Sequence, residues 1–255
     1  MSVITVENLR YRYPHAKELA LDGLDFSVEK GEFIGIIGEN GAGKSTLSQA
    51  LMGLVPQFYK GAYGGTVMVD GIEAGRTPVA QLCGHVGLVF QNPFNQLSGA
   101  KDNVYEEVAF GMQNLGVPAE EMKNRVEEAL KLLDIWQYRD RNPFDLSGGQ
   151  MQRVAIASVL VMRPDVMILD EPTSQLDPEG SDETLTGSGI TILMIEQKIE
   201  KLAAYCDRIL LLHKGKQIAF DTPQKVFSMP DLNNYGIQAP AFTRICKAEG
   251  VTLAD

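Results

Sequence analysis

The chain has 255 residues, of which 44% are hydrophobic, and its formal net charge is −10 at pH 7. A chain of this length and composition can bury a substantial core. The acidic balance argues against a protein that wraps nucleic acid, because neutralising phosphates requires a concentrated basic face.

The sequence also predicts that no segment spans a membrane or directs export. The longest uncharged apolar run lies between Arg153 and Arg163, about half of the ~20 residues that a spanning helix needs. The N-terminus lacks the basic-then-apolar pattern of an export signal. The cysteines and histidines lack the spacing of a disulfide framework or a metal site, which fits a reducing cytoplasm and structural or solvated histidines. These residues are Cys83, Cys206, Cys246, His15, His85 and His213.

Strands are predicted first along the chain. Residues 4–6 and the alternating run 65–71 predict antiparallel strands near its beginning. Four apolar runs predict strands buried on both faces of a parallel sheet. They cover residues 33–37, 86–90, 166–169 and 190–195. Apolar residues at helical spacing predict a helix over 119–133, whereas the tail from 222 onward, with its prolines and asparagines, predicts a small irregular appendage.

A glycine-rich loop follows the first of the buried strands. Residues 38–46 read G-E-N-G-A-G-K-S-T and precede a helix expected to begin near Thr46, which is the context of a Walker A phosphate-binding loop. In such a loop, backbone N–H groups hold phosphate oxygens, Lys44 reaches the β and γ phosphates, and the Ser45 hydroxyl binds Mg²⁺. The alternative, a chance glycine turn, does not explain the flanking elements. The predicted ATP-binding residues of the loop are Gly38, Asn40, Gly41, Gly43, Lys44, Ser45 and Thr46.

Two acids end the strand predicted over 166–169. At the carboxyl edge of a parallel sheet, Asp170 can hold Mg²⁺, while Glu171 faces the water that attacks the γ-phosphate. Acids after a strand are common, so this prediction depends on the Walker A loop.

The run 146–150 reads L-S-G-G-Q and resembles the signature of the ATP-binding cassette (ABC) ATPases. Its serine and glycine amides form an anion-binding nest at a helix start, a second phosphate site that the Walker A loop does not need for itself. The resemblance covers residues 3 to about 225. It implies a head-to-tail dimer in which the signature of one subunit closes on the nucleotide held by the other. The signature residues concerned are Ser147, Gly148, Gly149 and Gln150.

Other positions match the same family. Tyr13 resembles the aromatic residue that stacks on adenine, with Tyr11 as a competitor and a buried strand tyrosine as the alternative. Gln91 resembles the Q-loop glutamine, which implies contact with Mg²⁺ or water and a relay of closure to the transporter. Residues 174–177 resemble the D-loop, which crosses the dimer interface.

Finer features, at 89–96, 107–111 and 114–118, resemble the A component of energy-coupling-factor (ECF) transporters, which take up vitamins or cobalt and nickel ions. In such systems two cassette subunits, identical or paralogous, bind a membrane scaffold called the T component, which holds a substrate-binding S component. The neighbouring acids Glu106 and Glu107 would suit a groove that receives basic coupling helices, or would form a solvated charged pair.

Two features depart from the family pattern. After the strand at 190–195 the family places a histidine where this chain has Gln197. An amide can hydrogen-bond to the γ-phosphate but cannot carry a proton at neutral pH, so slower turnover is expected. The segment 178–189 is shorter than usual and lacks most of the expected helix, although at this length it still bridges about 40 Å.

The predicted fold is α/β: a P-loop NTPase ABC cassette with a mostly parallel sheet, N-terminal antiparallel strands and an inserted helical subdomain. Its predicted parts are a core in two pieces (1–92 and 163–222), a helical signature subdomain (93–162) and a C-terminal tail (223–255).

The predicted function is ATP binding and hydrolysis for an ABC/ECF-type importer. The resemblance places the chain peripherally at the cytoplasmic face of the cell membrane, with ATP and Mg²⁺ as cofactors and no nucleic-acid partner. Two alternatives stay open. One is an ATP-dependent clamp with little hydrolysis, which Gln197 keeps open. A non-transport ABC ATPase acting on DNA or ribosomes is the other, although such proteins usually carry a coiled coil or tandem cassettes, and this sequence shows neither.

Overall fold

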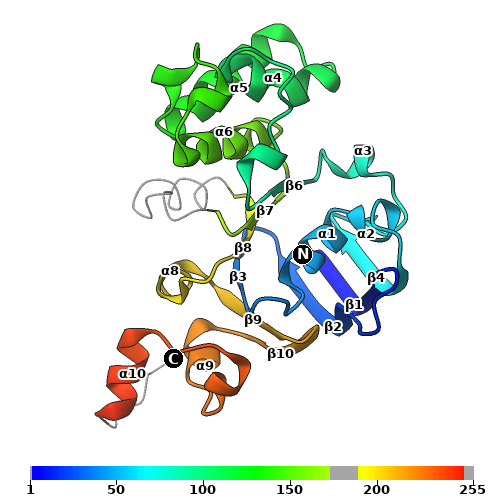
Figure 1. Cartoon of the computed structure of the whole chain (residues 1–255), viewed down its shortest axis with the longest axis vertical. Coiled ribbons are helices and arrows are strands. Elements are labelled where there is room, and N and C mark those ends of the chain that lie inside the picture. Colours follow the sequence, from blue (N-terminus) through cyan, green and yellow to red (C-terminus); the bar gives the residue numbers. More distant parts are fainter. Residues whose placement is uncertain (1, 173–188, 250–255) are drawn as a thin grey trace.

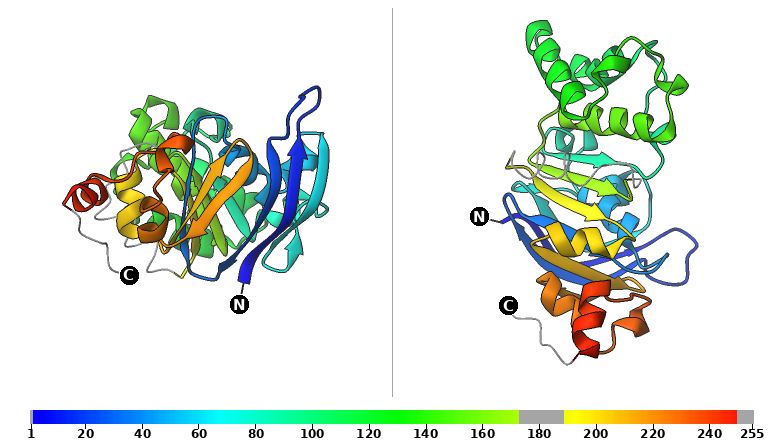
Figure 2. Two further views of the ribbon diagram at one scale, coloured as in Figure 1. Left: turned by 90° about the horizontal axis from the view of Figure 1, so that it is seen from below. Right: turned by 90° about the vertical axis from the view of Figure 1, so that its left-hand side faces the viewer.

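The computed structural model describes residues 2–172 and 189–249. A helical lobe lies at one end of the molecule, two sheets occupy the middle, and the C-terminal helices lie at the other end (Figure 1; Figure 2, right). Within these residues, no helix combines the length and the apolar character needed to cross a membrane.

The central sheet has six strands in the order β10-β9-β3-β8-β7-β6, and all neighbours run parallel except β10 and β9. All of β3 is buried, with Ile34 and Ile36 in one apolar cluster and Phe33 and Ile37 in another. Burial on both faces explains why such strands are continuous apolar runs. The four predicted parallel strands are confirmed to within one residue at each end. The bounds are β3 Phe33–Ile37, β6 Val86–Val89, β7 Val166–Asp170, β8 Thr191–Ile195, β9 Arg208–His213 and β10 Lys216–Asp221.

A smaller antiparallel sheet has the order β2-β1-β4-β5. The predicted stretches 4–6 and 65–71 fall on β1 and β4, and β1 pairs with both of its neighbours. Between them these strands supply much of the apolar cluster beneath the first helix, including Leu9, Leu24 and Val67. The bounds are β1 Ser2–Arg12, β2 Leu21–Glu29, β4 Ala62–Val69 and β5 Ile72–Glu73.

The helical lobe is inserted between β6 and β7 and contains α4, α5 and α6 (Figure 1). The helix predicted over 119–133 is confirmed as α5, which buries Val126, Ala129 and Leu130. Helix α6 begins after Ser147, whose side chain forms a reciprocal capping box with Gln150. The bounds in the lobe are η1 Pro93–Asn95, α4 Val104–Asn114, α5 Ala119–Leu132, η2 Trp136–Tyr138, η3 Pro143–Asp145 and α6 Gly148–Leu160.

The remaining helices flank the sheets and build the tail. The prediction of an irregular tail was wrong, because Pro223 starts a helix in its favoured first-turn position and Thr243 and Cys246 bury one side of another. The first helix begins at Lys44, two residues before the expected Thr46. The bounds are α1 Lys44–Leu51, α2 Leu54–Gln57, α3 Val79–Leu82, α8 Ile199–Tyr205, α9 Pro223–Phe227, η5 Leu232–Tyr235 and α10 Ala241–Ala248.

Candidate nucleotide-binding site

A cleft of about 490 Å³ lies at the carboxyl edge of the parallel sheet. The loops that follow β3, β6, β7 and β8 all contribute to it, because parallel neighbours end at the same edge. Most of the predicted loop residues and all three predicted catalytic residues come together there. The lining residues are Tyr13, Ala20, Asn40, Gly41, Gly43, Lys44, Ser45, Thr46, Gln91, Glu171 and Gln197.

The glycine-rich loop wraps the start of α1. Gly43 has φ +106°, and a Cβ there would lie 2.6 Å from the carbonyl oxygen of Ala20, so only glycine fits this close approach. The buried ammonium of Lys44 donates to the carbonyl oxygens of Gly38 (2.8 Å) and Glu39 (3.0 Å). Burial lowers the pKa of Lys44, and the nearby carboxylates oppose this shift. The loop therefore holds a partly desolvated cation at the helix N-terminus, the arrangement that phosphate oxygens need.

Asp170 lies beside the loop at the end of β7. Burial raises the pKa of its carboxyl group, while a hydrogen bond with Ser45 acts in the opposite direction. A hydroxyl and a desolvated carboxylate are hard oxygen ligands, and a bound cation would relieve the cost of burying the negative charge. These residues therefore fit Mg²⁺.

Glu171 is held on both of its carboxylate oxygens. Gln91 Nε2 donates to Oε2 at 2.6 Å, and Gln197 Nε2 donates to Oε1 at 2.9 Å. Its backbone has φ +47°, a strained value for a residue with a side chain, and its N–H donates to the carbonyl oxygen of Ile195 at 2.9 Å. The sequence predicted three catalytic residues, but it did not predict that the two amides would contact the carboxylate directly.

Tyr13, rather than Tyr11, lines the cleft. Its hydroxyl shares a hydrogen bond with Thr46 Oγ1 (3.1 Å) and donates to Gln49 Oε1 (2.9 Å). Tyr11 is fully buried and donates to the carbonyl oxygen of Tyr59 at 2.8 Å. Ala20 and Gln49 were missed because nothing in their local sequence distinguishes them.

The signature residues do not join this cleft. They open onto a separate cleft of about 230 Å³ in the helical lobe. Ser147 N–H donates to Gln150 Oε1 at 3.0 Å, so the capping box orders the start of α6 there. The two predicted phosphate sites therefore lie in separate clefts of one chain. The lining residues of the second are Asp134, Gln137, Tyr138, Ser147, Gly149, Gln150 and Arg153.

Two glutamines tie the Q-loop to the helical lobe. Gln96 Oε1 accepts a hydrogen bond from the Phe90 N–H at 3.1 Å, and its Nε2 donates to the Ala155 carbonyl in α6 at 2.8 Å. Gln152 of α6 donates to the Phe90 carbonyl at 3.3 Å. The residue just before Gln91 is thus bonded to α6 directly through its carbonyl group, and indirectly, by way of Gln96, through its N–H group.

The expectation for Glu107 was wrong. Its side chain is 4% exposed and accepts hydrogen bonds from the Ser98 backbone N–H (2.5 Å) and hydroxyl (2.8 Å). Buried carboxylates are retained where they are hydrogen-bonded, so Glu107 orders the loop before α4 and faces neither a docking groove nor solvent. Glu106 is exposed.

The predicted D-loop at 174–177 and residues 178–188 lie outside the described residues.

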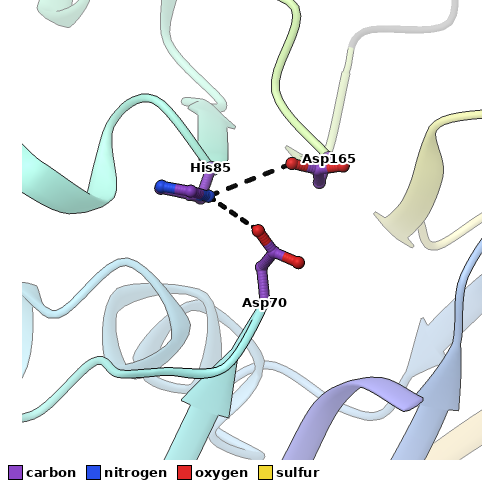
Figure 3. A group of neighbouring side chains, drawn as sticks. All are labelled: Asp70, His85 and Asp165. Carbon is purple, nitrogen blue, oxygen red and sulfur yellow. Dashed lines mark hydrogen bonds and ion pairs between the residues drawn. The ribbon is translucent and has the colours of Figure 1, made fainter. Parts of the chain in front are cut away.

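A second polar cluster lies at the amino edge of the parallel sheet, away from the nucleotide cleft (Figure 3). His85 Nδ1 is 2.8 Å from Asp70 Oδ2 and 3.9 Å from Asp165 Oδ2. Their ligand atoms lie within 4.8 Å of one another, a grouping that the spacing of the histidines did not predict. Lys30 donates to Asp165 Oδ1 at 2.7 Å, which raises the pKa of Lys30. We assign the cluster a structural role, because Lys30 and His85 already engage its two carboxylates and link the β4–β5 turn to the central sheet.

The fold and the cleft define a P-loop nucleotide-binding protein. Residues 21–174 match the ABC transporter family. A putative ABC transporter ATP-binding protein of Pyrococcus abyssi is 44% identical over 99% of this chain and 93% of its own length. The energy-coupling factor transporter ATP-binding protein EcfA1 of Lacticaseibacillus paracasei is 45% identical over 94% of this chain and 86% of its own.

Solved structures of ABC transporter cassettes have a similar fold. The structure of cbiO1 from Clostridium perfringens, part of the ABC transporter complex cbiONQ, has a TM-score of 0.77 and 35% identity, and the match covers 96% of this chain and 99% of that one. The chain belongs to the ABC transporter family as an ATP-binding subunit, and its ATPase activity is coupled to transport. The predicted ABC cassette fold is confirmed.

Proposed function

We propose that this chain is the ATP-hydrolysing subunit of an ECF-type importer and works in a head-to-tail dimer with a second cassette subunit, a copy of itself or a paralogue. The observation that carries the dimer is the separation of the two clefts. Lys44 and Ser45 lie in one, and Ser147 lies in the other. ATP held by the first cleft of one subunit would be covered by the second cleft of its partner.

The residues divide the work within the first cleft. Lys44 and the loop amides bind the β and γ phosphates, and Ser45, Asp170 and Gln91 are the residues that would hold Mg²⁺. The metal supplies charge neutralisation on the phosphates. Glu171 orients the attacking water or accepts its proton.

Gln197 acts first by positioning Glu171, since its amide donates to Oε1 of that carboxylate. This contact extends the predicted role of Gln197 at the γ-phosphate. Tyr13 stacks on the adenine, because its ring lines the same cleft as the loop.

The membrane partner docks beside the Q-loop. Phe94 and Phe144 lie there with ring centroids 6.1 Å apart, and their residues are 57% and 43% exposed. An exposed aromatic pair of this kind is typical of an interaction surface. We propose that it receives a helix of a T-type membrane scaffold, which holds an S component specific for a vitamin or a metal ion. This would place the chain peripherally at the cytoplasmic face of the membrane.

The test is the variant Glu171→Gln. It should keep the fold and the affinity for ATP, but form a stable dimer with ATP and Mg²⁺, because the γ-phosphate that joins the subunits is no longer removed. Size-exclusion chromatography with light scattering measures the change, with Lys44→Ala as the control that should remain monomeric.

A Glu171→Gln chain that stays monomeric under conditions in which the parent dimerises would contradict the role of Glu171. A parent that binds ATP and dimerises but shows no turnover, alone or with its membrane partners, would instead support the clamp. Co-purification from membranes identifies those partners.

A further inference from the structure

The C-terminal tail contacts the Walker A loop at Glu39. Gly236 ends η5 in the left-handed conformation, with φ +70°. A Cβ at this glycine would lie 2.0 Å from Glu39 Oε1 and 2.4 Å from Glu39 Cδ. The tail turn therefore lies directly against the Glu39 carboxylate, and a methyl group at this glycine would displace the Glu39 side chain from its present position.

Glu39 is approached from a second element as well. His213, at the end of β9, places Nδ1 3.8 Å from Glu39 Oε2, and this buried nitrogen has no hydrogen-bond partner among the described residues. The His213 ring also packs edge-on against Tyr235, with centroids 5.4 Å apart. Tyr235 donates to Asp231 Oδ2 at 3.1 Å, which holds the tail turn together.

The backbone of the same residue belongs to the phosphate-binding loop. The carbonyl oxygen of Glu39 accepts from Lys44 Nζ at 3.0 Å and from the Ala42 N–H at 3.1 Å. A shift of Glu39 would therefore move the carbonyl group that holds the lysine. Half of the Glu39 side chain faces solvent, so the contact can change without opening the core.

We propose that Glu39 is a positioning residue through which the tail sets the geometry of the Walker A loop, and thereby the affinity for ATP. The proposal depends on nucleotide binding at this loop, as proposed above. Glu39 itself need not touch the nucleotide. It connects the turn at Tyr235 and Gly236 to the carbonyl group that fixes Lys44.

The first test is Gly236→Ala, which forces a methyl group against the Glu39 carboxylate. We expect binding of a non-hydrolysable ATP analogue to weaken by roughly 3- to 30-fold, the usual range for perturbing a coupled network. KM for ATP should rise while kcat changes little. Gly116→Ala is the matched control, since Gly116 has φ +71° but nothing within 4 Å of its would-be Cβ. It imposes the same backbone strain and should leave affinity within about twofold.

The second test is a double-mutant cycle with Glu39→Ala. If Gly236→Ala weakens ATP binding by displacing the Glu39 side chain, it should have no further effect on ATP affinity in the Glu39→Ala background. The cycle compares the glycine change with and without the carboxylate, so the effect of removing the charge cancels. Glu39→Gln, which keeps the shape, should bind ATP within about twofold of the parent.

Equal affinity in the Gly236→Ala and Gly116→Ala chains would overturn the proposal, as would an undiminished effect of Gly236→Ala in the Glu39→Ala background. Thermal unfolding of each variant shows whether a change reflects only lost stability. Lys44→Ala separates the two proposals. If Lys44→Ala binds ATP normally, the proposal that nucleotide binds at this loop is wrong. If Lys44→Ala loses ATP binding but Gly236→Ala keeps it, only the proposed role of the tail is wrong.

Discussion

Gln197 stands where the family has a histidine, and the structure gives its amide a specific task. The amide donates to Glu171 Oε1, while Gln91 holds Oε2. The neighbouring Glu196 turns back to accept from the N–H groups of Gln197 (3.0 Å) and Lys198 (3.1 Å). Its carboxylate therefore orders the turn before α8, and Glu196 is not among the described residues that line the nucleotide cleft.

Replacing Gln197 with histidine should raise ATP turnover. A histidine can carry positive charge toward the γ-phosphate as charge develops there, and the expected gain is about 1–3 kcal/mol of transition-state stabilisation, or roughly tenfold to a hundredfold in rate. ATP affinity should change little, because the difference lies in the transition state. Steady-state ATPase assays on the parent, Gln197→His and Glu196→Ala provide the comparison. If the parent already turns over at about 1 s⁻¹ or more and Gln197→His is no faster, the amide is a working substitute.

The ionised Asp170 side chain should lower the free energy of unfolding of the nucleotide-free protein. Burial raises the pKa of this carboxyl group above its ordinary value of 3.8. The folded state thus favours the protonated acid, so its contribution to stability is present below pH 3.8 and is lost as the pH rises through the folded value.

At pH 7 without Mg²⁺, Asp170→Asn should therefore raise Tm by about 2–4 °C, the shift that 1 kcal/mol produces in a domain of this size. Its advantage over the parent should shrink as the pH falls toward the folded pKa. Scanning fluorimetry across this pH range measures both effects. The same variant should lose the stabilisation that Mg²⁺ and ATP give the parent, and a lower Tm for the apo variant would contradict this account.

The sequence predicts the parts of the site but not the contacts between them. The loop, the two acids and the signature were predictable because each is a local pattern attached to a strand or a helix. The Gln91–Glu171–Gln197 contacts were not, since the three residues follow different strands and meet only once the sheet has formed. The cluster of Asp70, His85 and Asp165 went unpredicted for the same reason.

Elements were predictable where burial leaves an unambiguous pattern. β3, and β7 up to its last residue Asp170, consist of buried residues without charged side chains because both faces are covered. β2 was missed, since Gly23 with φ +72° and a register shift nearby interrupt its alternation. The tail helices were missed because each is short, and turn-forming residues lie between them.

Gln152 offers a test of how the Q-loop and the signature helix are connected. It donates to the Phe90 carbonyl, while its own Oε1 has no partner among the described residues. Gln152→Met keeps the volume and removes the unpaired oxygen, so the free energy of unfolding should change by less than about 1.5 kcal/mol.

The connection between α6 and the Q-loop would nevertheless be weaker in Gln152→Met. We expect stimulation of ATP hydrolysis by the membrane partner to fall by roughly 3- to 30-fold, while ATP binding is kept. ATPase assays in reconstituted membranes, with the exposed Gln113→Met as the control, measure this effect. Full stimulation in Gln152→Met would show that the contact carries no coupling.

At the scale of the whole molecule, the two clefts predict complementation between defective chains. Lys44→Ala removes the loop function, and Ser147→Asp keeps a good helix cap while repelling the partner's phosphate. Each variant alone should be inactive. Mixed in equal amounts, half of the dimers contain one intact composite site, so activity should recover to about a quarter of the parent's. ATPase assays on the mixture measure the recovery, and no recovery would exclude a head-to-tail dimer of two copies.

The engagement of both Glu171 oxygens has a consequence for the energy metabolism of the cell. A transport ATPase that hydrolyses ATP when no cargo is ready dissipates the phosphorylation potential as heat. Here each oxygen of the carboxylate already accepts one amide hydrogen bond, from Gln91 or from Gln197, and Gln91 follows a residue bonded on both sides to the helical lobe. We expect a shift of that lobe to change how the carboxylate holds water, so that turnover without the membrane partner is low. The rate of ATP hydrolysis would then depend on the arrival of cargo at the membrane partner and not on the ATP concentration of the cell.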